Sequence, residues 1–353
     1  GFINLTARNV TNIIIQNAYV IILAIGMTLV VITGNIDMSV GSVCGFTGAT
    51  AAILYNTGIG LIPTILITVI LGLFIGSIIG FFTAYKAVPA FIVTLAGMQV
   101  FRGLTYAITN MSPIGFYDDR FGNISAGFIQ DYLPGDGNFS VIIIMLLIFI
   151  AYVIIDYKGI QKKIEKGIHV EKKSYYVNKY IAILVADLML TWVFFTYRGI
   201  PNVFVIIAIL ALIMTYVLNN TVFGRHVYAI GGNKEAAELS GIDAKKTLFK
   251  VYIIMGAFAA LAGIVFASYM NQALPVAGNM FELDAIASTY IGGASAAGGI
   301  GTVAGSVIGG FILGVINNGM SILNLGAQWQ YVVKGLVLLS AVLYDLKMNK
   351  KQR

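Results

Sequence analysis

Charge, cysteine and histidine are all scarce in this sequence, and each shortage argues against a class of protein. Only 10% of the 353 residues are charged, whereas soluble globular domains carry about 25%. A water-soluble fold of this length needs more polar surface, which argues against a soluble enzyme, a nucleic-acid binder and a disordered protein. The single cysteine, Cys44, cannot form an intrachain disulfide, and one thiol with two histidines is too small a ligand set for a His/Cys metal cluster.

Hydrophobic residues make up 58% of the chain and are gathered into long runs, which is typical of a polytopic membrane protein. About eleven apolar runs are present, at residues 18–33, 39–57, 61–85, 90–109, 140–156, 180–197, 201–219, 251–270, 284–297, 302–318 and 330–345. They predict an all-α fold of about eleven transmembrane or re-entrant helices, in a single transmembrane domain that covers residues 1–353. The run 284–297 is too short to cross the membrane upright, so we expect it to be re-entrant or broken.

Most of the basic residues occupy four places along the chain. Seventeen of the 22 lie in an insert at residues 157–179 that we expect to be a loop, in a loop at residues 221–250, in the C-terminal tail and at Lys86. By the positive-inside rule these places face the cytoplasm, so the net charge of +7 is an orientation signal and not a sign of nucleic-acid binding. The acidic loop at residues 110–139 then lies outside.

The same alternation of spans places residues 1–17 outside the membrane. A bacterial inner-membrane protein would need one more helix upstream in order to start in the cytoplasm. We therefore expect that a first transmembrane helix is missing from this chain. The alternative is that the protein begins outside.

Glycine is abundant, with 40 residues, and much of it recurs at four-residue spacing. Small residues at positions i and i+4 let helices approach closely in lipid, so we expect two helix-packing faces. Their residues are Gly72, Gly76 and Gly80 in one run, and Gly301, Gly305 and Gly309 in another.

Two glycine-flanked polar segments, residues 34–42 and 278–284, interrupt the apolar runs. Both begin Gly-Asn-x-x with acidic residues close by, which hints at an internal repeat of two halves. Such breaks expose backbone donors and acceptors that suit a polar solute, and acidic side chains inside a membrane indicate function because burying them is costly. The candidates for a translocation pathway are Asn35, Asp37, Ser39, Gln99, Arg102, Glu282 and Asp284.

A simpler interpretation of each break stays open. An ordinary interfacial turn would also place acidic residues at the N-terminus of the next helix, where they cap it and interact well with its dipole. Lys334 is a weaker candidate, because a lysine near the end of an apolar run can extend its amine to the interface. The sequence shows no nucleophile–base arrangement, so we expect no catalytic residue.

The basic loop at residues 221–250 contains a distinctive segment, residues 223–242. Asn233 is placed to cap a short helix that begins at Lys234, and Gly241 is placed to stop it. A small amphipathic helix at the cytoplasmic surface would suit docking into the groove of a partner. The predicted coupling residues are Gly231, Gly232, Asn233, Lys234, Glu235, Ala236, Ala237, Leu239, Ser240 and Gly241.

Residues 223–242 resemble the cytoplasmic coupling loop of bacterial ABC sugar permeases of the ribose, xylose and galactose type. Further segments that resemble the same family are residues 34–42, residues 278–293, Asn317-Asn318-Gly319 and Val333-Lys334-Gly335. The resemblance covers nearly the whole chain. The basic insert and the segment Tyr197-Arg198-Gly199-Ile200-Pro201 look closer to the xylose or multiple-monosaccharide branch.

The resemblance implies the permease subunit of an ATP-driven importer that moves a monosaccharide across a bacterial cytoplasmic membrane. It implies a cytoplasmic ATPase, an extracytoplasmic sugar-binding protein and a second permease copy, usually in a homodimer. Membrane lipid would surround the chain, and no nucleic acid is involved. The sequence has no G-x-x-x-x-G-K-[ST] motif, so ATP would bind to the partner subunit and this chain would need no cofactor.

The alternative from another class is an ion-coupled secondary transporter or channel for a small polar solute. Asp37, Glu282 and Asp284 would then be ion or proton sites. This alternative accounts for the intramembrane acids and not for the coupling segment. The sequence leaves open which sugar is carried, because a separate binding protein would hold the specificity.

Overall fold

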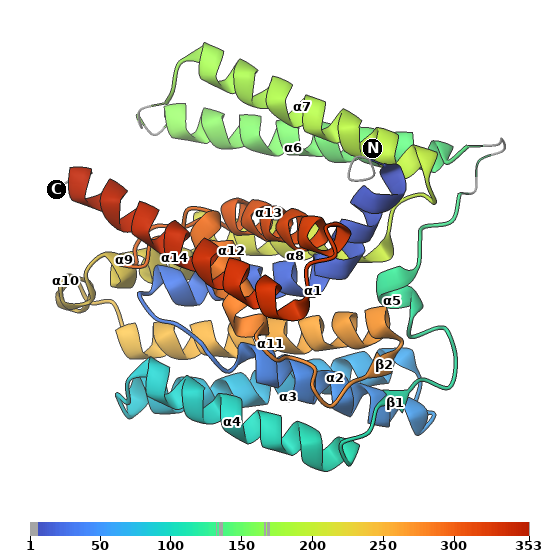
Figure 1. Cartoon of the computed structure of the whole chain (residues 1–353). Coiled ribbons are helices and arrows are strands. Elements are labelled where there is room, and N and C mark those ends of the chain that lie inside the picture. Colours follow the sequence, from blue (N-terminus) through green and yellow to red (C-terminus); the bar gives the residue numbers. More distant parts are fainter. Residues whose placement is uncertain (1–5, 132, 134–136, 166, 168–169, 353) are drawn as a thin grey trace. The chain divides into compact units, whose positions relative to one another are not determined.

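The computed structural model describes residues 6–131, 133, 137–165, 167 and 170–352 (Figure 1). Helices account for almost all of its regular structure. They are α1 (Ala7–Ile32), α2 (Val40–Asn56), α3 (Leu61–Gly80) with the π-helical turn η2 (Phe81–Tyr85), α4 (Ala90–Thr109), α5 (Asn123–Ala126), α6 (Phe139–Glu165), α7 (Lys173–Thr196), α8 (Asn202–Asn220), α9 (Val222–Gly232), α10 (Lys234–Leu239), α11 (Ala244–Met270), α12 (Phe281–Ile291), α13 (Val303–Ile322) and α14 (Ala327–Gln352). Two short strands, β1 (Ile114–Gly115) and β2 (Gln272–Ala273), pair antiparallel.

The apolar runs of the sequence lie largely in helices, and the expected all-α polytopic membrane fold is confirmed. The run 284–297 is helical only as far as Ile291, where α12 ends. Within the described residues, eight helices are long and apolar enough to cross a membrane: α1, α3 with η2, α4, α6, α7, α8, α11 and α13. The apolar part of α14, Ala327–Leu343, is shorter. The 11 residues of α12 rise only about 16 Å, roughly half of the hydrocarbon core, so α12 has the length of a broken or re-entrant helix.

The chain divides into two compact units. Unit 1 comprises residues 1–12 and 128–201, and its main feature is the hairpin of α6 and α7. Unit 2 comprises residues 13–127 and 202–353, and it contains both polar breaks and the predicted coupling segment. The interpretation of the whole chain as one transmembrane permease domain stays a prediction.

The basic insert at residues 157–179 is largely helical, although the sequence predicts a loop. α6 continues to Glu165, and α7 begins at Lys173. The difference arises because the two helices continue beyond their apolar runs into lysine-rich sequence, where lysine is a good helix former. The connection between them is therefore short.

The helix α11 is buried along most of its length and packs against α2 and α3. Gly72, Gly76 and Gly80 of α3 face it. A Cβ on Gly72 would collide with the carbonyl oxygen of Gly256, and a Cβ on Gly76 would collide with that of Tyr252. Bare backbone on α3 therefore sets the close approach of the two helices, as small residues do in lipid.

The second glycine set is divided between α13 and the loop before it. Gly305 and Gly309 lie in α13 and face α12, and a Cβ on Gly305 would collide with the carbonyl group of Gly292. Gly301 precedes the helix and does not share its face, because Thr302 caps α13 by accepting the N–H of Gly305 at 3.0 Å.

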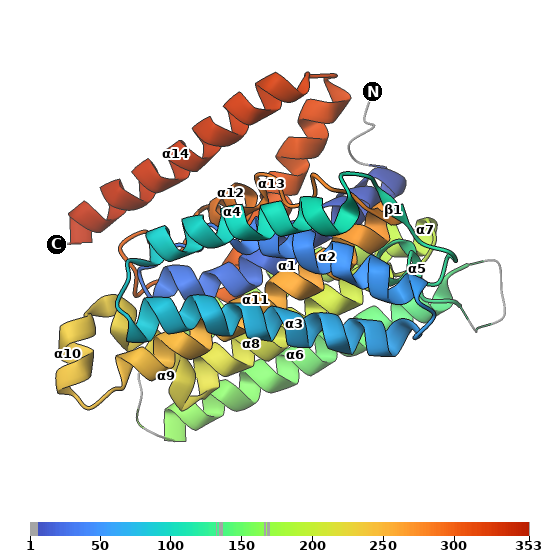
Figure 2. The same cartoon turned by 90° about the horizontal axis from the view of Figure 1, so that it is seen from below.

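Two groups of elements mark opposite ends of unit 2 (Figures 1 and 2). α9 and α10 lie at one end, and β1, β2 and α5 lie at the other. At the second end, Tyr55 of α2 donates a hydrogen bond of 2.7 Å to Asp118, which belongs to the acidic loop that the sequence places outside. Within unit 2, the predicted coupling segment and Asp118 of the predicted external loop thus lie at opposite ends of the helices.

Candidate functional site

The first break lies between α1 and α2, and its polar side chains bond mainly within the break. Asp37 is 2% exposed, and its Oδ1 accepts hydrogen bonds from the backbone N–H and the hydroxyl of Ser39, at 2.8 and 2.6 Å. Asn35 donates from its side-chain amide to the carbonyl and hydroxyl oxygens of Thr33, at 3.2 and 3.1 Å. The Asp37 carboxylate therefore orders the turn into α2, which is the local role that a simple interfacial turn predicts.

The second break leads directly into α12. Gly278 and Met280 have φ angles of +85° and +66°, so the chain turns through left-handed residues just before the helix starts at Phe281. Glu282 and Asp284 occupy the first turn of α12 and are 3% and 4% exposed. The free N–H groups of the helix N-terminus favour carboxylates at these positions.

The two breaks meet at the first turn of α2. A Cβ on Gly41 would collide with the carbonyl oxygen of Gly278 and with Oε2 of Glu282. A Cβ on Gly278 would in turn collide with the carbonyl oxygen of Gly41. Because both positions are glycine, residues 34–42 and 278–284 form one polar region, which we call the paired breaks.

The acids of α12 interact electrostatically with basic residues of two other helices. Lys334 of α14 donates from Nζ to Oδ2 of Asp284 at 2.7 Å, in an ion pair whose side chains are 23% and 5% exposed. From the sequence, Lys334 could simply extend its amine to the membrane interface. The structure instead pairs it with an acid of the second break. Arg102 of α4 acts electrostatically on Glu282. Nη2 of Arg102 and Oε2 of Glu282 are buried, and neither atom has a hydrogen-bond partner among the described residues.

Three residues of α4 and α11 depart from the expected pathway set. Gln99 is exposed on α4, whereas Gly97 packs against the first break, where an added Cβ would lie 3.3 Å from Cβ of Ser39. Tyr252 of α11, which the sequence analysis does not single out, is buried and lines a small pocket together with Asp37 and Ser39. A tyrosine within an apolar run is the sequence signal that indicates such a residue, because its hydroxyl needs a polar neighbour.

The predicted short helix is present as α10, with both predicted boundaries. Asn233 accepts the N–H of Ala236 through Oδ1 at 2.9 Å, which caps the N-terminus. Gly241 has a φ angle of +84°, and Ile242 donates its N–H to the carbonyl oxygen of Ala237 at 3.1 Å. This Schellman ending satisfies carbonyl groups that the last helical turn leaves free.

One face of α10 is anchored and the other is exposed. Ala237 is buried in an apolar cluster whose other buried members are Ala84, Ile230, Ala244 and Leu248. Ala236 is exposed, and Leu239 at the end of the helix is 90% exposed. The sequence assigns all three side chains to coupling, whereas the structure turns Ala237 inward, where it fixes α10 to the bundle.

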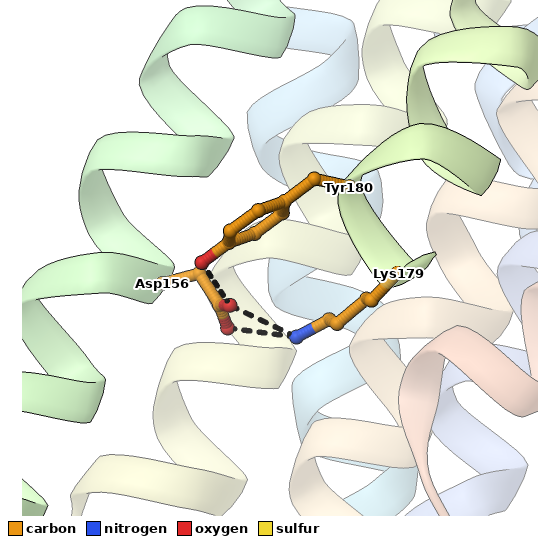
Figure 3. A network of polar contacts seen from close by, with 3 residues as sticks. All are labelled: Asp156, Lys179 and Tyr180. Atoms are coloured by element: carbon orange, nitrogen blue, oxygen red, sulfur yellow. Dashed lines mark hydrogen bonds and ion pairs between the residues drawn. The ribbon is translucent and has the colours of Figure 1, made fainter. Parts of the chain in front are cut away.

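Unit 1 contains a separate polar network on its hairpin (Figure 3). Asp156 of α6 forms an ion pair with Lys179 of α7, with distances of 2.9 and 3.0 Å from Nζ to the two carboxylate oxygens. Tyr180 donates its hydroxyl to Oδ2 of Asp156 at 2.9 Å. These bonds join the two helices of the hairpin, so we assign the network to its stability.

The arrangement of unit 2 defines a class of protein. No group of three or more His, Cys, Asp and Glu side chains that could hold a metal ion occurs in the part of the chain that the structure describes. Two broken segments instead meet inside a bundle of membrane helices, and a short capped helix projects from one end of it. Discontinuous helices that meet within a membrane bundle are typical of transport proteins.

The chain belongs to the family described as branched-chain amino acid transport system / permease component, whose model matches residues 9–342. It is 40% identical over 348 residues to the xylose transport system permease protein XylH of Escherichia coli (strain K12), a match that covers 98% of this chain and 87% of that protein. It is 39% identical over 348 residues to XylH of Haemophilus influenzae, with coverages of 98% and 91%. It is 34% identical over 347 residues to the ribose import permease protein RbsC of Escherichia coli (strain K12), with coverages of 98% and 87%. No solved structure matches this chain.

These similarities agree with the family resemblance seen in the sequence. The relatives are named as permeases for xylose and for ribose, and the family model covers nearly the whole chain. The chain is a permease component of a transport system and a multi-pass protein of the bacterial cytoplasmic membrane.

Proposed function

We propose that this chain is the permease subunit of an ATP-driven ABC importer that moves a monosaccharide related to xylose, ribose or galactose across the cytoplasmic membrane. The names of the similar xylose and ribose permeases support this substrate class. The observation that carries the proposal is α10, a helix capped at both ends that presents Ala236 and Leu239 outward. A short projecting helix of this kind suits the groove of a cytoplasmic ATPase.

This proposal requires partners at both ends of the permease. A separate ATPase binds and hydrolyses ATP, so this chain needs no cofactor of its own. An extracytoplasmic sugar-binding protein delivers the sugar at the end where β1, β2 and α5 lie. A second copy of the chain completes the membrane part as a homodimer within the lipid, and nucleic acid has no role.

We further propose that the paired breaks line the translocation pathway. The pathway residues are Asn35, Asp37, Ser39, Gln99, Arg102, Glu282 and Asp284. Sugars are neutral, so a pathway for them needs hydroxyl-matching donors and acceptors rather than a fixed charge. The pairing of Asp284 with Lys334 and the position of Arg102 near Glu282 support this, because they offset the charge of both acids. A weak site is adequate where the binding protein supplies the specificity.

The second candidate is an ion-coupled secondary transporter or channel for a small polar solute. The observation that favours it is Asp37, a buried carboxylate that accepts hydrogen bonds from Ser39 and forms no ion pair with the described residues. Buried carboxylates in membrane proteins often carry protons or ions. An imposed ion gradient would then drive uptake without ATP.

Uptake by reconstituted vesicles separates the two candidates. The permease is placed in proteoliposomes with its ATPase and binding protein, and uptake of labelled xylose, ribose and galactose is measured. We expect uptake of one of these sugars to require ATP hydrolysis and to stop when orthovanadate blocks it. Undiminished uptake with hydrolysis blocked would reject the ATP-driven mechanism.

Docking of α10 is tested by two outward-facing substitutions, Ala236→Arg and Leu239→Asp. Each should reduce co-purification of the ATPase by about tenfold while membrane insertion is unchanged, because both side chains lie outside the buried cluster. Ser112→Arg is the matched control, since Ser112 is exposed on the loop that follows α4, far from α10, and should leave ATPase binding unchanged. Normal ATPase binding by both α10 variants would remove this docking assignment.

A further inference from the structure

The coupling segment touches the rest of unit 2 through bare backbone at Gly231. Gly231 is the penultimate residue of α9, just before α10. A Cβ on Gly231 would collide with the carbonyl oxygen of Ile32 and would lie 2.6 Å from the backbone nitrogen of Gly299. The N–H of Gly299 already donates to that same oxygen of Ile32 at 2.8 Å. Three segments distant in the sequence are therefore in backbone contact at one point.

Two further glycines, Gly298 and Gly34, lie at the same contact. Gly298 has a φ angle of +84°, and a Cβ there would lie 2.8 Å from the carbonyl oxygen of Gly231 and 3.0 Å from the backbone nitrogen of Gly34. We call Gly34, Gly231, Gly298 and Gly299, with the Ile32 carbonyl group, the glycine junction. No side chain separates its members, so they cannot absorb a displacement by changing rotamer.

Each segment of the glycine junction leads to a different part of the transport machinery. Ile32 ends α1, so the junction adjoins the first break at residues 34–42. Gly298 and Gly299 lie in the loop that follows α12, the helix that begins at the second break. Gly231 lies in the last turn of α9, the helix that precedes α10. The segment before α10 and the segments that adjoin both breaks therefore meet at one contact.

A side chain adds a second tie between α9 and the loop after α12. Tyr228 donates its hydroxyl to the carbonyl oxygen of Gly301 at 2.7 Å. Burial raises the pKa of the Tyr228 phenol, so the hydroxyl keeps the proton that this bond needs. Tyr228 lies three residues before Gly231, so both face the same loop.

We propose that the glycine junction transmits the movement of α10 to both breaks at once, with Gly231 and Tyr228 as positioning residues for transport. The proposal rests on the function proposed above, in which α10 docks on an ATPase. Two breaks driven from one contact would open and close in a fixed order. A contact network with two discrete arrangements is the physical requirement for such coupling.

The test compares two helical glycines, one inside the glycine junction and one outside it. Gly231→Ala places a methyl group against the Ile32 carbonyl. Gly103→Ala is the matched control, because Gly103 lies on α4, outside the coupling segment, and a Cβ there meets nothing within 4 Å. Both variants are purified with the ATPase, and sugar uptake and ATP hydrolysis are measured in the same proteoliposomes. We expect the Gly231→Ala complex to hydrolyse about tenfold more ATP per sugar transported, and the Gly103→Ala complex to match the native ratio.

Tyr228→Phe covers the case in which Gly231→Ala fails to assemble. This substitution removes one hydroxyl and keeps the ring. We expect the variant complex to hydrolyse about threefold more ATP per sugar transported. A role in stability alone would lower uptake and hydrolysis together and leave their ratio unchanged. An unchanged ratio in Tyr228→Phe and in any Gly231→Ala complex that assembles would overturn the proposal, whereas a native complex without ATP-driven uptake would overturn the proposed function itself.

Discussion

The acids of the second break interact electrostatically with basic side chains from two different helices. Asp284 pairs directly with Lys334 of α14, and Glu282 lies within the electrostatic influence of Arg102 of α4. Taking a single charge out of water is costly, and its partner offsets much of that cost. The ion pair therefore matters most when one partner is removed.

The substitution Lys334→Met should destabilise the permease by about 3 kcal/mol, because it leaves the buried carboxylate of Asp284 without its cation. The measurement is thermal unfolding of the detergent-solubilised protein, with a lower unfolding temperature as the expected result. Methionine keeps most of the volume of the lysine side chain, so packing changes little.

A double-mutant cycle isolates the charge effect of this pair. Adding Asp284→Asn to Lys334→Met removes the uncompensated charge and should recover most of the lost stability. Additive effects of the two substitutions would mean that the side chains do not interact in the membrane.

At the scale of elements, the contact between α3 and α11 depends on glycine. A Cβ on Gly76 would collide with the carbonyl oxygen of Tyr252, so α3 can approach α11 this closely only without a side chain. Hydrophobic burial does little to hold helices together within lipid, because lipid is itself apolar. Close van der Waals packing therefore stabilises the contact.

The substitution Gly76→Ala should lower the free energy of unfolding by about 1–3 kcal/mol, because the methyl group forces α3 and α11 apart. Gly103→Ala is the matched control on α4, where an added Cβ meets nothing within 4 Å. There alanine should be neutral or stabilising by up to about 1 kcal/mol, through its higher helix propensity. An equal change in unfolding temperature for Gly76→Ala and Gly103→Ala would contradict this account of the contact between α3 and α11.

The helix α10 shows which properties of an element are local. Asn233 and Gly241 mark its two ends in the sequence, and both ends are where those residues predict, because capping involves only a few neighbouring residues. The inward direction of Ala237 depends instead on Ala84 and Leu248, which belong to other elements. A six-residue helix is too short for its own sequence pattern to reveal which face is buried.

At the scale of the whole molecule, unit 2 has two chemically different ends. The end with α9 and α10 carries basic residues that the positive-inside rule assigns to the cytoplasm. The opposite end carries β1, β2, α5 and residues 116–122 of the acidic loop. This difference in charge between the two ends predicts how the protein is oriented in the membrane.

Cysteine labelling in intact cells tests that orientation. The native thiol, Cys44, is buried, so it gives little background. We expect a membrane-impermeant maleimide added outside to label Asp119→Cys, and to label Glu238→Cys only after the membrane is permeabilised. Both positions are exposed in the structure. The reverse pattern would invert the assigned topology and would place α10 out of reach of a cytoplasmic ATPase.

The sequence by itself determined the membrane class, the helical runs, the short capped helix and the family. Each of these rests on composition, on runs of about 20 residues or on local motifs, which are visible along a single chain. It also located both breaks, because glycine with polar residues stands out within an apolar run.

Only the tertiary structure decided what those segments touch. It brought the two breaks together at Gly41 and Gly278, paired Lys334 with Asp284, and joined Gly231 to the Ile32 carbonyl. These contacts link residues about 50 to more than 200 positions apart, and they depend on how helices cross and not on any local pattern. The direction of a side chain on a short helix and the partner of a buried charge are therefore properties of the packed bundle.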